Sequence, residues 1–245
     1  MRYTSLHIHS LFCDGYDSIL DIIKEAIKLN LDTIGILYHS YTSFDESYCI
    51  KKDKIDEFIN LVERYKKEFQ NLINIKHGVE QDYFSETDTK QHDYLIGSVH
   101  YIKKNDKYYP IDSSKEETIK LVNELYNGDY YEFSKDYFNL VSQVVSKTKC
   151  TIIGHFDLVT KYNLFDTDNE KYRLLYKNAV DKLIPYNIPF EINTSIVDEK
   201  GEPYPSLEII NYIKSKGGKF ILSSDAHKKE NLIKHFDEYI KYIGD

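Results

Sequence analysis

The sequence predicts an α/β fold of the (β/α) barrel kind, in a single domain. Short apolar or β-branched runs alternate with longer segments of helical periodicity, which is the pattern of parallel β/α architectures. The chain has 245 residues, close to the about 250 of a typical barrel domain. No repeat, low-complexity tract or linker divides it, so we expect one domain spanning residues 1–245.

The predicted strands are short segments rich in β-branched or apolar residues and bounded by turn residues. Seven segments fit this description, namely residues 3–9, 33–38, 73–79, 94–99, 151–154, 189–193 and 220–224.

The predicted helices lie between and after these strands. Asp17 or Ser18 and Ser134 stand where side chains cap helix N-termini, and Gly217 with Gly218 marks a helix end. The helical segments are residues 18–29, 54–69, 115–126, 135–146, 170–183, 206–216 and 229–242.

Side chains that can bind metals stand where six of the seven predicted strands end. In a barrel the C-terminal ends of the strands form one rim and build the active site, so these side chains should converge. Asp14, in the turn after the first strand, can reach the same rim. The residues at the strand ends are His7 and His9, His39, Glu80, His100, His155, Glu191 with Asn193, and Asp225 with His227.

Two pairs of these residues share an i, i+2 spacing, His7 with His9 and Asp225 with His227. Alternate side chains of a strand point to the same face, so each pair can bind one ion without distorting the backbone. Imidazole nitrogens and carboxylate oxygens are donors that Zn²⁺, Mn²⁺ and Fe ions accept. One site assembled from both ends of the chain is therefore expected. By contrast, His77, His92 and His235 fall off the predicted rim.

Composition and charge limit the class of partner. The net charge of −8, from 32 Lys and Arg against 40 Asp and Glu, argues against a nucleic-acid or anionic-membrane surface. A small phosphorylated substrate remains compatible if a bound metal supplies positive charge. Three cysteines without a CxxC pattern indicate free thiols. With no apolar signal segment or transmembrane run, a cytoplasmic protein is expected.

The ordered set of motifs resembles the polymerase-and-histidinol-phosphatase (PHP) family of metallophosphoesterases over nearly the whole chain. The fourth and sixth motifs below resemble its histidinol-phosphatase branch. The motifs are His7-Ile8-His9-Ser10 with Asp14, Tyr38-His39-Ser40, Gly78-Val79-Glu80-Gln81-Asp82-Tyr83, Asp93-Tyr94-Leu95-Ile96-Gly97-Ser98-Val99-His100, Gly154-His155-Phe156-Asp157, Glu191-Ile192-Asn193-Thr194 and Ser224-Asp225-Ala226-His227.

The resemblance implies a distorted seven-stranded TIM-like barrel that holds a trinuclear centre of Zn, Mn or Fe. It further implies three ligand sets: His7, His9, Glu80 and Asp225 for the first metal, Glu80, His100 and His155 for the second, and Asp14, His39 and His227 for the third. Glu80 would bridge two ions about 3.5–4 Å apart, since each carboxylate oxygen can serve one cation. Two to three bound ions are expected.

The chain departs from the family pattern at the substrate side. Tyr38 precedes His39 where the family usually has an acid. Lys161 and Asp198 stand where two arginines are expected to hold the substrate phosphate, with Lys200 as the nearest cation to the second position. Lysine is a point charge and not a bidentate fork, so these departures bear on phosphate binding and on substrate identity.

The leading functional hypothesis is a metal-dependent phosphomonoesterase that hydrolyses L-histidinol phosphate in histidine biosynthesis. A hydroxide bridging metals held by Glu80 and Asp225 would attack the phosphate, and Lys161 would help to neutralise it. Asp157 and Glu191 are candidates for supporting or proton-transfer roles.

Two alternatives stay open: a PHP phosphoesterase acting on another monoester, a nucleotide or a phosphodiester, and a metal-binding interaction module without activity. The acidic net charge opposes the nucleic-acid substrates, and the intact ligand set opposes the inactive module. Metal identity, the general acid for the leaving group and the oligomeric state are left open by the sequence.

Overall fold

The computed structural model describes residues 2–243 and places all seven predicted strands in one parallel sheet. The sheet order follows the chain, interrupted only by a two-stranded hairpin, β5–β6. The strands of the sheet are β1 (Thr4–Ile8), β2 (Thr33–Ile36), β3 (Asn74–Asp82), β4 (Tyr94–Ser98), β7 (Ile152–Ile153), β8 (Phe190–Asn193) and β9 (Phe220–Ser223).

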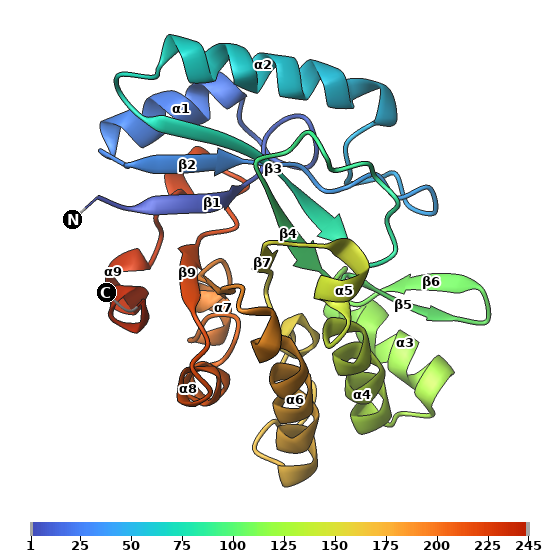
Figure 1. Ribbon diagram of the computed structural model, residues 1–245. Coiled ribbons are helices and arrows are strands. Elements are labelled where there is room, and N and C mark those ends of the chain that lie inside the picture. Colours follow the sequence, from blue (N-terminus) through green and yellow to red (C-terminus); the bar gives the residue numbers. More distant parts are fainter. Residues whose placement is uncertain (1, 244–245) are drawn as a thin grey trace.

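Helices cover the outside of this sheet (Figure 1). In Figure 1, α1 and α2 lie along β1–β3, while α4, α6 and α8 are lined up beyond the later strands. The α-helices are α1 (Ile19–Lys28), α2 (Ile55–Glu68), α3 (Lys115–Tyr126), α4 (Tyr130–Val141), α5 (Val144–Thr148), α6 (Glu170–Leu183), α7 (Val197–Lys200), α8 (Leu207–Ser215) and α9 (Phe236–Tyr239). Within residues 2–243, no helix has both the length and the apolar character needed to cross a membrane.

The two edge strands of the sheet, β1 and β9, are joined by backbone hydrogen bonds at their C-terminal ends. A parallel bridge joins Ile8 to Ala226. The amide of His9 donates to the carbonyl of Ala226 at 2.9 Å, and the amide of Ala226 donates to the carbonyl of His7 at 3.1 Å. The sheet is therefore nearly closed into a barrel, as predicted, and its closing contact sets the two i, i+2 pairs side by side.

A tyrosine fills the interior of the barrel below the strand ends. The hydroxyl of Tyr94 donates to the carbonyl of Leu6 across the barrel at 2.6 Å. Gly35 and Gly78 face this ring, and a Cβ at either position would come within 2.4 Å of a Tyr94 side-chain atom. A small apolar cluster of Leu37, Tyr94, Ile96 and Ile152 thus closes the barrel beneath the polar rim.

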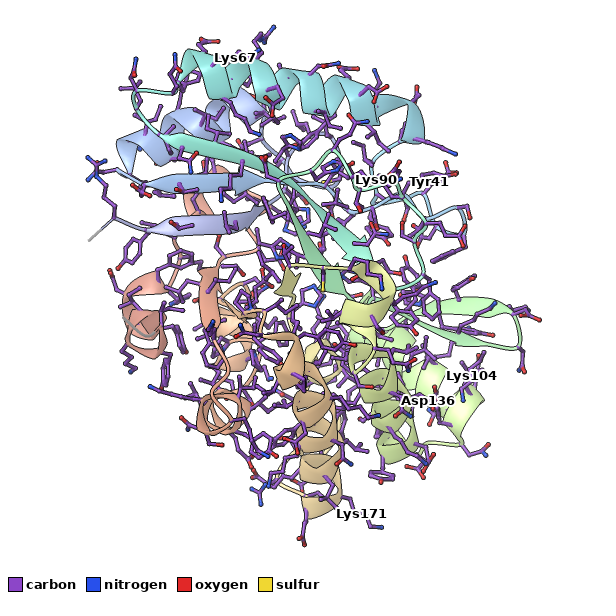
Figure 2. The ribbon with its side chains drawn as sticks, viewed as in Figure 1. Tyr41, Lys67, Lys90, Lys104, Asp136 and Lys171 are labelled. Atoms are coloured by element: carbon purple, nitrogen blue, oxygen red, sulfur yellow. The ribbon has the colours of Figure 1, made fainter. Side chains whose placement is uncertain are left out.

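The hairpin of β5 (Tyr101–Lys104) and β6 (Lys107–Pro110) was not predicted. Its turn residues, Asn105 and Asp106, both have positive φ, which is the backbone of a tight hairpin turn. Figure 2 shows Lys104 of β5 facing Asp136 of α4, and their charged atoms are 2.6 Å apart. The hairpin is therefore tied to the helical layer, with its following loop beside the strand ends.

Two predicted helices differ from the structure. The fourth begins at Tyr130, because Asp129 caps it by accepting hydrogen bonds from the amides of residues 131 and 132. Ser134, the predicted cap, instead donates to the carbonyl of Tyr130 inside that helix. The last predicted helix, 229–242, is broken at His235, whose φ of 60° is left-handed and incompatible with a continuous helix. Only α9 and short 3₁₀ turns remain there.

Candidate metal centre

The side chains of all nine predicted metal ligands meet at the C-terminal ends of the barrel strands. They come from β1, from β3 and from the turns that follow β1, β2, β4, β7 and β9. Three groups of these side chains place their ligand atoms within 4.8 Å of one another. The groups are His9, Asp14, His39 and His227; His7, His9 and Asp225; and His39, Glu80 and His100.

Glu80 lies at the centre of the cluster, 1% exposed. Its Oε1 faces His155 Nε2 at 2.8 Å and His100 Nε2 at 3.2 Å. Its Oε2 faces His39 Nδ1 at 2.9 Å and His7 Nε2 at 3.2 Å. The two oxygens of one carboxylate thus serve two different sets of imidazoles, as a bridging ligand would.

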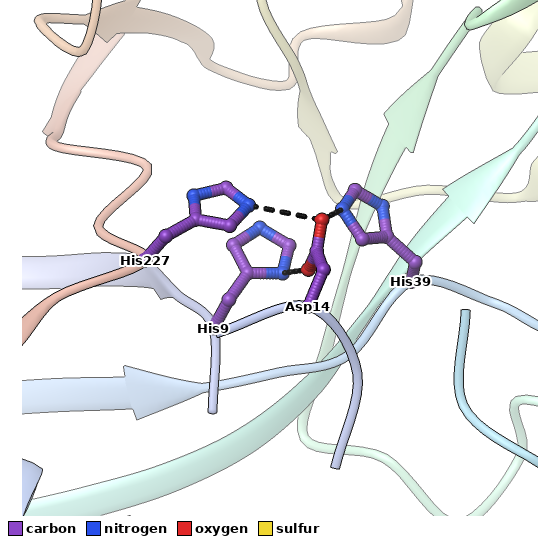
Figure 3. A group of neighbouring side chains, drawn as sticks. All are labelled: His9, Asp14, His39 and His227. Atoms are coloured by element: carbon purple, nitrogen blue, oxygen red, sulfur yellow. Dashed lines mark hydrogen bonds and ion pairs between the residues drawn. The ribbon is translucent and has the colours of Figure 1, made fainter. Parts of the chain in front are cut away.

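Asp14 gathers three imidazoles on the other side of the cluster (Figure 3). Its Oδ2 is 3.3 Å from His227 Nε2 and 3.4 Å from His39 Nε2, and its Oδ1 is 3.6 Å from His9 Nδ1. The turn after β1 therefore brings Asp14 back to the rim, as predicted from its position near His9.

Asp225 joins the first two histidines at the closing seam of the barrel. Its Oδ1 is 3.1 Å from His9 Nε2 and 3.3 Å from His7 Nε2. Asn193 donates from Nδ2 to the other oxygen at 3.1 Å. The backbone of Asp225 has a φ of 47°, which is uncommon for a residue with a side chain, although Asp adopts it more readily than most.

The charges of the cluster compensate one another. Burial raises the pKa of the Glu80 carboxyl, but attraction to His39, His7 and a third imidazole outweighs burial and holds the pKa well below its usual value. Burial lowers the pKa of His39, yet Glu80 and Asp14 raise it to about 10. Burial and two neighbouring imidazoles lower the pKa of His9 to about 3. The carboxylates are thus ionised and share protons with some of the imidazoles, and these protons are what a metal cation displaces.

The residues fit a metal centre by their chemistry and by what they leave unpaired. His7 Nε2, Asp14 Oδ1 and Glu80 Oε2 are buried and point into the cluster. Ring nitrogens or carboxylate oxygens lie 2.9–3.6 Å from them, but within residues 2–243 none of these contacts has the geometry of a hydrogen bond. Buried polar atoms without partners are costly, so their number at one place needs an explanation. Imidazole nitrogen and carboxylate oxygen are the donors of Zn, Mn and Fe sites.

Two further carboxylates stand behind the ligands. Glu191 on β8 places Oε1 2.6 Å from His7 Nδ1, and its Oε2 accepts from the amide of His155 at 3.1 Å. Asp82 on β3 accepts from the amide of His100 at 3.0 Å and lies 3.3 Å from its Nδ1. Asp82 was missed by the sequence analysis, although its i, i+2 spacing from Glu80 on one strand could have indicated it.

A cavity of about 450 Å³ opens above the cluster. Its floor includes Asp14, His39, Glu80, His100, His155, Asp225 and His227, and its walls include Asp45, Tyr48, Tyr101, Asp112, Lys161 and Tyr204. Among these wall residues only Lys161 is one of the predicted substrate-binding residues. Asp45 and Tyr48 lie in the loop after β2, Tyr101 and Asp112 lie in or beside the unpredicted hairpin, and Tyr204 lies between α7 and α8.

Of the three predicted substrate-binding residues, one lines the cavity and two do not. Lys161 lines the cavity. Lys200 is buried elsewhere, donating to Thr160 Oγ1 at 2.7 Å with Asp157 Oδ2 3.9 Å away. Asp198 is half exposed and pairs with Lys234 and His235, outside the residues that line the cavity. Asp198 and Lys200 lie in α7, which is only one turn long. Their positions in the sequence after Asn193 therefore did not predict the directions of their side chains.

Tyr38 and His77, which the sequence analysis singled out, also face away from the cluster. Tyr38, which replaces the family's usual acid, is buried, and its hydroxyl donates to His92 Nε2 at 2.9 Å. His77 points to α2, where its Nε2 is 3.1 Å from Glu63 Oε1. The grouping of Glu63, His77 and Asp93 could hold a cation, but Lys66 already lies 2.6 Å from both carboxylates.

Comparisons with known proteins agree with this geometry. The model of the PHP domain matches residues 5–195. The chain is 27% identical over 251 residues to a Schizosaccharomyces pombe protein named "Probable histidinol-phosphatase", covering 91% of this chain and 80% of that one. It is 22% identical over 260 residues to the histidinol-phosphatase of Bacillus subtilis, covering 96% and 97%.

Solved structures share the fold. A crystal structure from Listeria monocytogenes matches with a TM-score of 0.87 at 21% identity, covering 96% of this chain and 99% of that chain. The histidinol phosphate phosphatase of Lactococcus lactis, solved with zinc, L-histidinol and phosphate, matches with a TM-score of 0.75 at 20% identity, covering 99% and 92%. The distorted barrel is therefore the fold of this chain.

Proposed function

The chain belongs to the PHP domain family, and from this membership we propose that it is a metal-dependent phosphatase that converts L-histidinol phosphate and water to L-histidinol and phosphate. The observation that carries the proposal is the position of Glu80, whose two oxygens face separate sets of imidazoles at the floor of an open cavity. Four curated relatives besides the one from Bacillus subtilis carry the same activity in their names. In this proposal the enzyme acts in the cytoplasm on a small phosphorylated metabolite.

Two to three divalent ions, Zn, Mn or Fe, would occupy the site. Contacts within each set support the ligand sets expected from the family resemblance: His7, His9, Glu80 and Asp225; Glu80, His100 and His155; and Asp14, His39 and His227. When bound, such ions polarise the phosphoryl oxygens and make water nucleophilic near neutral pH.

The other residues of the site would bind the substrate phosphate or orient the histidines that hold the metals. Lys161 directs a cation into the cavity, where it can hold a phosphate oxygen. Glu191 and Asp82 fix the ring orientation of His7 and His100, since a histidine that binds a metal usually gives its other N–H to such a group. Glu80 and Asp225 would hold the ions that make the reacting water nucleophilic.

The walls of the cavity oppose the polyanionic alternatives. Asp45 and Asp112 place two further carboxylates on the walls, beside Lys161 as the only lysine or arginine among the lining residues. A nucleotide or phosphodiester backbone would bring further negative charge against them. A small substrate that carries a positive group next to its phosphate suits this cavity better.

A phosphate-release screen tests the proposal. The purified chain is supplied with Mn²⁺, Zn²⁺ or Fe²⁺ in turn and offered L-histidinol phosphate, sugar phosphates, nucleotides and bis-p-nitrophenyl phosphate. We expect the highest kcat/KM on L-histidinol phosphate. A higher value on a nucleotide or diester would overturn the assignment, and no release from any substrate would favour a metal-binding interaction module.

A further inference from the structure

The wall of the cavity holds a fixed pair of opposite charges. Lys161 Nζ donates to the backbone carbonyl of Asp112 at 2.9 Å and lies 3.3 Å from its Oδ2. The two side chains are 29% and 28% exposed, so both can meet a ligand. An ammonium has three N–H donors, and two of them are directed at Asp112, which leaves one for a substrate oxygen.

The position of Asp112 relative to the metal ligands is set by its neighbours in the loop between β6 and α3. The amide of Ile111 donates to the carbonyl of His100 at 2.9 Å. The hydroxyl of Tyr162 donates to the carbonyl of Asp112 at 2.6 Å. These two hydrogen bonds fix the backbone of residues 111 and 112 beside the site, and the first of them joins that backbone to His100.

Asp112 has more unused capacity to accept hydrogen bonds than Asp45, the other wall carboxylate. Asp45 already accepts from Tyr101 at 2.8 Å and from the hydroxyl and amide of Ser47 at 2.6 and 3.1 Å. Within residues 2–243, the Oδ1 of Asp112 has no hydrogen-bond donor, and its Oδ2 has only the lysine. A carboxylate accepts up to about four hydrogen bonds, so about one site is left on Asp45 and about three on Asp112, which makes Asp112 the better suited of the two to receive a cation.

We propose that Asp112 recognises the ammonium of a substrate that carries its phosphate ester and its amino group on neighbouring carbons, with Lys161 beside it on the phosphate. L-Histidinol phosphate has this arrangement. Its phosphate would lie against the lysine and its ammonium against the aspartate, so that the four charges alternate in sign. A sugar phosphate or nucleotide lacks the positive group and would gain nothing from Asp112. This inference rests on the proposed function and names its specificity determinant.

The test compares two substrates that differ only in the amino group: L-histidinol phosphate and 3-(imidazol-4-yl)propyl phosphate. In the metal-loaded enzyme, Asp112→Asn should lower kcat/KM on the first by about 10- to 100-fold, the size of a lost hydrogen bond to a charged group. The effect should be mainly on KM, because the ammonium is not part of the reacting bond. On the second substrate, kcat/KM should be unchanged. Asp181→Asn, which removes the aspartate of a surface pair with Lys216, serves as the matched control and should change neither value.

The possible failures are distinct. If Asp112→Asn lowers kcat/KM on both substrates equally, Asp112 acts only by holding Lys161, and the inference is wrong while the proposed function stands. If the wild-type enzyme does not discriminate between the two substrates, ammonium recognition is absent. If it releases phosphate from neither, the proposed function fails and the inference with it. Inhibition by L-histidinol gives an independent readout, since Asp112→Asn should weaken it but leave inhibition by 3-(imidazol-4-yl)propan-1-ol unchanged.

Discussion

The carboxylate of Glu191 lies 2.6 Å from Nδ1 of His7, and both side chains are fully buried. The opposite nitrogen of the same ring, Nε2, faces Glu80 and Asp225. His7 is therefore held between one carboxylate on its Nδ1 side and two on its Nε2 side, where the proposed metal site lies. This arrangement assigns Nδ1 as the proton-bearing nitrogen and leaves Nε2 free for a metal.

We predict that Glu191→Gln weakens metal binding by about 10- to 100-fold, because an amide has no charge to hold the His7 N–H. Activity should return when the metal concentration is raised. The measurement is a chelator-competition titration of metal affinity, with Glu208→Gln, in a peripheral pair with Arg173, as control. Unchanged affinity would mean that Glu191 only fills space.

Histidines of the cluster and histidines outside it should respond differently to truncation. His100→Ala and His155→Ala each remove a contact to Glu80 Oε1, and turnover should fall by at least about 100-fold, as for loss of a ligand group. His77→Ala removes a contact to α2 and should mainly lower stability. Turnover is compared at equal metal content. An equal loss in His77→Ala would contradict the assignment of the strand faces.

Lys161→Ala should raise KM more than it lowers kcat. Lys161 lines the cavity, and in the proposed function its ammonium holds the phosphate in the ground state as well as in the transition state, so its loss should act mainly on binding. Steady-state kinetics on L-histidinol phosphate measure this. A drop in kcat at constant KM would instead give the lysine a role only in the transition state.

The pair of Tyr38 and His92 predicts a pH dependence of stability. Burial and the charge of His77 lower the pKa of His92 to about 4, and its Nε2 accepts from the tyrosine in the neutral form. Since the folded pKa lies below the usual 6.5, the contribution to stability is complete above pH 6.5. It is lost as the pH falls from there toward 4.

The partly exposed ring should contribute roughly 1–2 kcal/mol at neutral pH. Denaturant unfolding of wild type and His92→Gln at several pH values measures it. The stability difference between the two proteins should shrink below pH 6.5, and a difference that is constant down to pH 4 would contradict this account.

The sequence predicted the strands and the ligand cluster because both follow from local rules. Apolar runs mark the strands, and the parallel topology puts every strand end on one rim, so His100 and Asp225 could be assigned without knowing the packing. Asp112 could not be identified in this way. Asp112 lies in the loop that follows the β5–β6 hairpin, and the positions of the hairpin and the loop depend on tertiary contacts.

Side chains on short turns were equally hard to place from the sequence. Asp198 lies on a one-turn helix and pairs with residues about 37 positions later, His235 among them. His92 and His235, which the sequence pattern placed off the rim without indicating any partner, are partly buried and hydrogen-bonded. Local pattern gives the face of a strand, but it does not give the direction of a turn.

In the proposed function, one metal centre, assembled from both ends of the chain, hydrolyses L-histidinol phosphate. A metal titration of the metal-free protein, followed by phosphate release from this substrate and by elemental analysis, tests it most directly. We predict that activity is absent without metal, rises with added ions and reaches its plateau at two to three equivalents. Glu80→Gln should bind fewer ions and remain nearly inactive throughout. Full activity without metal, or a plateau below one equivalent, would contradict the account.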